Sequence, residues 1–210
     1  RQNALLLKLA RSAALSSGDL KAALHEITEA SAQGLAVSRA AIWFFEKDRR
    51  RMVCQDLFEL DSHQHSEGVT LRADDYPAYF SALAEDRTIT ADDAHTHPAT
   101  REFAESYLQP LGIYSMLEAP LRHKGEVIGV LCHEQCKERR TWRQEDVAYA
   151  GHMADFVAHA LDASDRRRAE QALQTMNQEL ERRVDERARA LQEASELVLR
   201  LQNEMTESKL

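Results

Sequence analysis

Cys132, His133 and Cys136 form the most chemically suggestive short cluster in the sequence. Two thiols four residues apart with an adjacent imidazole offer soft ligands to zinc, or two sulfurs for a disulfide. Neighbouring residues on a strand face opposite ways, however, so Cys132 and His133 do not both reach one metal ion. Only Cys54 is placed to add a third thiolate. The alternative is that Cys132 is a buried strand residue and Cys136 a loop thiol, and we expect no metal site here.

Two histidine pairs lie in polar loops, His63 with His65 and His95 with His97. Such pairs could sense pH or bind a divalent ion, although loop histidines are often simply solvated. Asp92 and Asp93 could bind a hydroxyl or amine of a ligand, or could instead cap a turn. Both interpretations stay open for these six residues.

Sequence motifs for catalysis are missing. The chain has no Gly-x-Ser-x-Gly, no phosphate-binding glycine loop and no second histidine to complete a zinc-protease pattern around His133. We therefore expect no catalytic residues and no enzymatic activity in this chain.

Charge is distributed unevenly along the 210 residues. Residues 166–210 carry nine basic and nine acidic side chains, so the net charge of −8 belongs to residues 1–165. An acidic domain repels phosphate backbones, which argues against nucleic acid as a partner. No apolar run is long enough to span a bilayer. The three cysteines do not show the regular spacing of a disulfide-bonded protein, so we expect them to be reduced thiols. We expect a cytoplasmic protein without membrane insertion.

The distribution of glycine and proline predicts one long C-terminal helix. All four prolines and all seven glycines lie at or before Gly151, so the chain from about Gln144 onward has little to interrupt a helix. Its apolar residues follow a heptad repeat, with Val and Leu at the a and d positions and Asn177 at an a position, a pattern typical of parallel dimers. The expected dimer interface comprises Leu173, Asn177, Leu180, Val184, Leu191, Val198, Leu201 and Met205. Arg187 departs from the pattern, and Met176 offers a competing register, where we place a bistable element.

The preceding residues alternate between helical and strand patterns. We expect a helix in residues 1–16, a second helix from Asp19 to about Gln33 that Gly34 ends, and a final helix that continues into the coiled coil. Strands are expected at 39–45, 51–58, 88–90, 115–122 and 126–134, with a polar loop at 61–68 and short helices at 76–85 and 99–108. This order indicates an α+β fold with a central antiparallel sheet and helices on one face.

Several segments together resemble a GAF domain of bacterial sensor kinases and cyclases. The strongest are residues 111–121, the glycine turn and strand of 125–134, and the Arg-x-Trp pattern of 140–146; residues 38–45, 75–79 and 90–93 fit as well. The resemblance covers about residues 17–164. It divides the chain into an N-terminal helix (1–16), a GAF-like sensory domain (17–164) and a coiled-coil signalling helix (165–210).

The resemblance implies a ligand pocket on the sheet face opposite the long helices, with the histidine loops at its mouth. The residues expected to line it are Trp43, Cys54, Tyr76, Tyr79, Phe80, Asp92, Tyr107 and Met116. Cofactor and ligand stay unknown, because GAF domains bind diverse small molecules or only dimerise.

The functional expectation is a homodimeric sensory module. It would relay a small-molecule or protein signal through the coiled coil to a histidine kinase or diguanylate cyclase beyond residue 210. The alternatives are a ligand-free dimerisation scaffold and, third, a thiol or metal sensor built on Cys54, Cys132 and Cys136.

Overall fold

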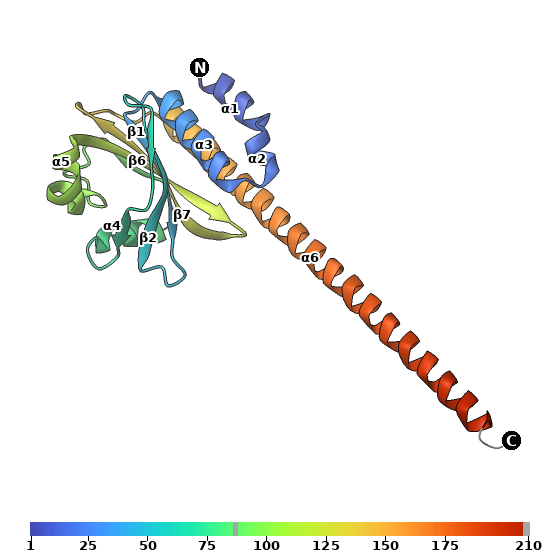
Figure 1. Ribbon diagram of the computed structural model, residues 1–210. Helices are drawn as coiled ribbons and strands as arrows, with labels where there is room; N and C mark the ends of the chain where they lie inside the picture. Colours follow the sequence, from blue (N-terminus) through green and yellow to red (C-terminus); the bar gives the residue numbers. More distant parts are fainter. Residues whose placement is uncertain (86–87, 208–210) are drawn as a thin grey trace. The chain divides into compact units, whose positions relative to one another are not determined.

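The computed structural model describes residues 1–85 and 88–207. Its helices and strands alternate along the chain as an α+β fold (Figure 1). The elements are α1 (Gln2–Ala10), α2 (Ala13–Ser17), α3 (Leu20–Leu35), β1 (Arg39–Phe45), β2 (Arg51–Glu59), β3 (Gln64–Ser66), β4 (Thr70–Arg72), α4 (Pro77–Ala84), β5 (Ile89–Ala91), η1 (Arg101–Phe103), η2 (Ala104–Leu108), α5 (Gln109–Leu111), β6 (Ile113–His123), β7 (Glu126–Cys136) and α6 (Gln144–Glu207).

A single antiparallel sheet organises the domain. Its strand order is β3-β2-β1-β7-β6-β5, with β4 also pairing with β2. The two hairpins β1–β2 and β6–β7 are joined through the β1–β7 pair, in which Ala41 lies opposite Cys132. Gly129 is required at this junction, because a Cβ there would collide with the carbonyl of Trp43. The predicted sheet is therefore confirmed.

The helix α3 and the start of α6 lie along one face of this sheet, with α1 and α2 beside them (Figure 1). Side chains from α1, α2, α3 and the first part of α6 pack with sheet residues such as Ile42, Leu117 and Leu131 in one apolar core. Asp19 caps α3 by accepting a hydrogen bond from the Ala22 amide at 3.1 Å, as its position before the apolar pattern predicts.

Gly34 does not end α3, contrary to the sequence prediction; the helix continues to Leu35, and Ala36 takes the left-handed conformation that ends it. The glycine instead allows a close approach between helices. A Cβ at this position would overlap the phenol ring of Tyr149 on α6. The Tyr149 hydroxyl donates a hydrogen bond to the Ala30 carbonyl at 2.9 Å, so the two helices are joined by packing and by a buried bond.

The helix α4 lies on the opposite face (Figure 1). Tyr79 and Leu83 of α4 and Phe103 of η1 pack there in a second apolar core with residues of β1, β2, β6 and β7. The helix predicted at 99–108 is irregular, with a 3₁₀ turn followed by a π-helical turn. The helices therefore do not lie on one face only: α1, α2, α3 and the start of α6 cover one face, and α4, η1 and η2 cover the other.

Two further predictions about loops beside strands are wrong. The segment 61–68 is not all loop, since Gln64–Ser66 forms β3 and pairs with residues 57–59 of β2. Cys136 is not a loop thiol, because it pairs with Ile113 at the end of β7. In both cases the strand pairing includes residues that the sequence pattern had assigned to a loop.

The chain divides into two compact parts, residues 1–165 and the part that begins at Arg166. The continuous helix predicted from Gln144 is confirmed, as α6 runs to Glu207. Within the second part, large apolar side chains are exposed at the predicted a and d positions, including Leu180 at 51% and Leu191 at 70%. The side chain of Met205, also in the predicted interface, lies outside the described residues. No helix in the described part of the chain is long and apolar enough to cross a membrane.

Candidate functional site

Charged and polar side chains are buried inside the second apolar core, on the face of the sheet covered by α4, η1 and η2. Glu118 lies opposite Cys132 across the β6–β7 pair, and Glu134 lies opposite Arg39 across the β1–β7 pair. Glu118 and Glu134 are at most 1% exposed. We call Arg39, Glu118, Cys132 and Glu134, with Tyr79 and Tyr107 above them, the buried polar layer.

Hydrogen bonds from the short helices complete this layer. The Tyr79 hydroxyl donates to Glu118 Oε2 at 3.1 Å, and the Tyr107 hydroxyl donates to Glu134 Oε1 at 2.8 Å. Arg39 Nη1 lies 3.3 Å from Glu134 Oε2. Glu134 Oε2 has only this ion pair, and Glu118 Oε1 accepts no hydrogen bond from the residues that the structure describes. A buried acceptor without a donor is costly, so Glu118 Oε1 could accept a bond from a donor group of a ligand.

Burial determines the protonation of these groups. It raises the pKa of Glu118 to about 7, with the neighbouring Glu134 charge acting in the same direction. It also raises the pKa of Glu134, although Arg39 opposes that effect. The Glu118 carboxyl group therefore changes charge near neutral pH. Carboxyl groups with such raised pKa values are common at functional sites.

Burial also keeps the thiols neutral. It raises the pKa of Cys54 to about 12 and that of Cys132 well above its ordinary value. A thiol is a poor nucleophile and a poor metal ligand compared with a thiolate. Within residues 1–85 and 88–207, none of the cysteines belongs to a group of three potential ligands lying within 4.8 Å of one another.

The structure brings together seven of the eight residues that the sequence predicts as pocket lining. Trp43, Cys54, Tyr79, Phe80 and Met116 are buried members of the second core, and Tyr76 and Tyr107 pack against it. Asp92 lies elsewhere: it is exposed, and its carboxylate accepts a hydrogen bond from the Trp142 amide at 3.0 Å. That bond anchors the segment before α6. The ligand-binding role of the eight residues stays a prediction.

Sequence analysis missed Arg39, Glu118 and Glu134. A signal was present, because both glutamates interrupt apolar strand runs at positions whose period-two neighbours point inward. A charged residue at an inward position of a strand is rare unless it is paired, and it indicates a polar site in the core.

The cysteine and histidine candidates occupy different places. Cys132 belongs to the second core, whereas His133 on the other face contacts the Leu117 carbonyl at 3.1 Å, so the predicted opposite orientation is confirmed. The His65 ring packs beside Phe58 of the first core, and it does not border a pocket on the second face, contrary to the prediction. His95 Nε2 contacts the Ile113 carbonyl, and His97 accepts from the Ala99 amide.

Comparison with known families decides the identity of the fold. Residues 19–161 match the model of the family described as GAF domain. The chain belongs to the GAF domain family.

Solved GAF structures superpose on most of the chain. A phycocyanobilin-bound GAF domain from a cyanobacterial phytochrome has a TM-score of 0.66 at 20% identity and covers 80% of this chain and 97% of its own. A fragment of a methyl-accepting chemotaxis protein, residues 122 to 287, has a TM-score of 0.62 at 20% identity and covers 79% and 99%. The free methionine-R-sulfoxide reductase of Neisseria meningitidis has a TM-score of 0.58 at 15% identity and covers 79% and 89%. At these identities the likeness shows the GAF fold alone.

One sequence relative matches part of this chain. An 81-residue stretch is 27% identical to a methyl-accepting chemotaxis protein of Synechocystis sp.. The stretch spans 39% of this GAF-domain chain but only 8% of that relative. In this GAF domain, the buried polar layer lies between the central sheet and the short helices that cover its second face.

Proposed function

We propose that this GAF domain is the sensory module of a bacterial signal-transduction protein. It dimerises in parallel through α6 and relays the state of a ligand or other signal to a C-terminal effector, a histidine kinase or a diguanylate cyclase. The family and the chemotaxis relatives support a role in signalling.

The exposed apolar stripe of α6 is the observation that carries the proposal. Leu173, Leu180, Val184, Leu191, Val198 and Leu201 are each more than half exposed. An isolated helix with such a stripe is unstable in water unless a partner covers the stripe. The heptad spacing fits a second copy of the same helix, and Asn177 at an a position favours a parallel dimer with fixed register.

A connection between the sheet and α6 supports the relay. The Arg140 guanidinium donates to the Leu35 carbonyl of α3 at 2.5 Å and pairs with Asp146 of α6 at 3.1 Å. The Arg140 amide donates to Ser115 Oγ of β6 at 2.7 Å. One residue thus joins a strand of the sheet to both helices, and a shift of β6 on ligand binding would act on the start of α6.

Cysteine crosslinking tests the dimer and its register. In a parallel coil, the two copies of an a position face each other, whereas f positions lie on the outside. We expect Val184→Cys to form a disulfide-linked dimer under mild oxidation and Arg189→Cys, at an f position, to form far less. Equal crosslinking at the two positions would contradict the proposed interface.

Locking the competing registers near Met176 tests the relay. We expect disulfides that fix the two registers to hold an attached effector in opposite activity states. Identical effector output from both locked forms would rule out register change as the signal.

A ligand-free dimerisation scaffold is the second candidate function. The observation that favours it is the close packing of the predicted pocket lining, since Trp43, Cys54, Tyr79 and Met116 are at most 4% exposed. Native mass spectrometry of the purified protein distinguishes the two functions. A retained small molecule supports the sensor, and an unliganded dimer that no candidate metabolite stabilises supports the scaffold.

A further inference from the structure

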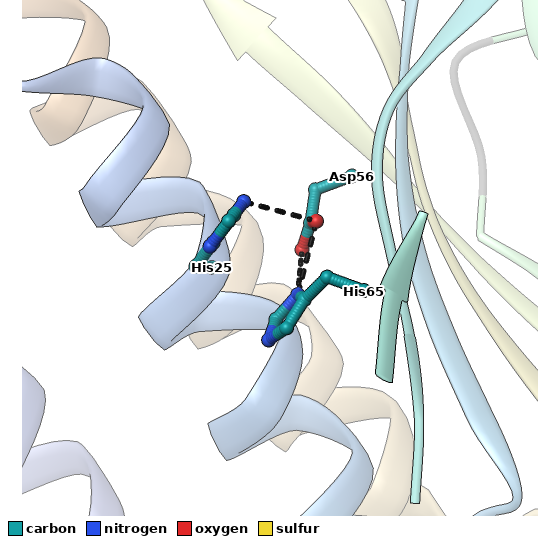
Figure 2. Close-up of side chains that lie close together, drawn as sticks. All are labelled: His25, Asp56 and His65. Atoms are coloured by element: carbon teal, nitrogen blue, oxygen red, sulfur yellow. Dashed lines mark hydrogen bonds and ion pairs between the residues drawn. The ribbon is translucent and has the colours of Figure 1, made fainter. Parts of the chain in front are cut away.

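Three side chains from three elements converge between α3 and the edge of the sheet. His25 comes from α3, Asp56 from β2 and His65 from β3 (Figure 2). His25 Nε2 lies 3.4 Å from Asp56 Oδ1, and His65 Nδ1 lies 3.0 Å from the same oxygen. One ligand atom from each residue lies within 4.8 Å of the other two. This cluster is on the opposite face of the sheet from the buried polar layer.

The spacing of these atoms suits a small transition-metal ion. Ligand atoms on one tetrahedral zinc ion lie about 3.4 Å apart, given metal–ligand distances of about 2.0–2.1 Å. The His25–Asp56 distance is already at this value, and the His65–Asp56 distance has to lengthen by only a few tenths of an ångström. These two distances need only small changes, and the third pair, His25 and His65, has ligand atoms within 4.8 Å of each other.

Neighbouring residues form hydrogen bonds with the proposed ligands, and in known metal sites such bonds hold the ligands in position. Thr28 donates a hydrogen bond to the other oxygen of Asp56 at 2.5 Å. The far nitrogen of His65, Nε2, lies 3.3 Å from Glu29 Oε1. A carboxylate that accepts from the distal nitrogen of a histidine fixes its tautomer and directs the other nitrogen toward the metal.

The cluster is also accessible to an ion from solvent. The Asp56 side chain is 2% exposed, whereas those of His25 and His65 are 33% and 22% exposed, so the cluster opens to solvent on its histidine side. The two imidazole rings stack with centroids 4.2 Å apart and an angle of 14° between their planes, so one ring has to rotate before both rings direct a nitrogen at the same ion. Two imidazoles and one carboxylate favour zinc, nickel or cobalt over calcium or magnesium, which prefer oxygen ligands.

We propose that His25, Asp56 and His65 bind one divalent transition-metal ion, zinc being the representative, with water at the remaining coordination position. His25 coordinates through Nε2 and His65 through Nδ1, with Glu29 orienting His65. The bound ion joins β3 to α3. This site is separate from the proposed sensory site, and its test does not depend on that function.

Calorimetric titration of the chelator-treated full chain with zinc chloride at pH 7 tests the site. We expect one ion per chain with an affinity in the micromolar range or tighter. His25→Gln and His65→Asn are each expected to weaken binding at least tenfold. His152→Ala, which removes an exposed histidine of α6, is the matched control and is expected to bind as the wild type does.

Two outcomes overturn the proposal: no zinc binding by the wild type at 100 µM protein (roughly a hundredfold above a 1 µM Kd), and unchanged binding by both histidine variants. Circular dichroism checks the fold of each variant. If the histidine variants unfold, the Glu29→Gln variant tests the site instead, because Glu29 is partly exposed. Residues that hydrogen-bond a metal ligand contribute about 10- to 100-fold to metal affinity. The proposal would also be overturned if two results were found together. The first is an unchanged zinc affinity of Glu29→Gln, and the second is that zinc shifts the imidazole ¹⁵N signals of histidines other than His25 and His65.

Discussion

Glu118 is a carboxyl group whose protonation is set by the fold. Its pKa in the folded chain is about 7, above the ordinary value of 4.5. Between these pH values the folded chain holds a proton that the unfolded chain has lost. The contribution of this group to stability is therefore complete below about pH 4.5 and is lost as the pH rises through about 7.

Glu118→Gln tests this dependence. From pH 5 to pH 8, the free energy of unfolding of the wild type should fall relative to that of the variant by on the order of 2–3 kcal/mol. Urea denaturation at a series of pH values measures the difference. Glu126→Gln, an exposed change on β7, is the control and should follow the wild type. A constant difference between wild type and Glu118→Gln across this range would contradict the raised pKa.

At the scale of elements, two glycines within helices should respond in opposite ways to the same substitution. Gly34→Ala places a methyl group against the Tyr149 ring and should destabilise the fold by about 1–3 kcal/mol. Gly151→Ala meets no atom within 4 Å and should stabilise α6 by about 0.5–1 kcal/mol. Thermal unfolding of both variants measures the two shifts, and shifts of the same sign would show that the helix contact is not as close as described.

The elements that sequence analysis predicted well are those with strong local patterns. The β1 bounds 39–45 coincide with the prediction because seven mostly apolar residues end at a charged turn. The strand β3 was missed because Gln64–Ser66 is short and polar. Its support comes from pairing with β2 and from the contacts of His65 with Asp56 and with Glu29, which lies 36 residues earlier. Contacts between residues far apart in the sequence cannot be predicted from a local sequence pattern.

The same limit applies to the sites. Most of the predicted pocket lining gathers on one face because strand alternation and family resemblance both place it there. The cluster of His25, Asp56 and His65 could not be predicted, since His25 lies 31 residues before Asp56 and only the packing of α3 on β2 brings them together. The sequence around a single histidine on a predicted helix does not indicate which residues of other elements will contact it.

For the whole molecule, the sequence and the structure agree that residues 166–207 lack a core of their own. Leu191→Glu should therefore weaken dimerisation at least 100-fold, because it puts two carboxylates opposite each other at the centre of the coil. Sedimentation equilibrium measures the change. Gln192→Glu adds the same charge at an outer position and should leave the dimer intact. If both variants dimerise equally, the apolar stripe is not the interface.

The contact of Gly34 with Tyr149 has a mechanical consequence. A slide of α6 along α3 would push the phenol ring out of its notch and leave the Ala30 carbonyl without its donor. We therefore expect α3 and residues 144–165 of α6 to move together at this contact and not to slide past each other. His25 lies nine residues before Gly34, about 13 Å along α3. A change of position at His25 would then be passed on to Tyr149 through α3.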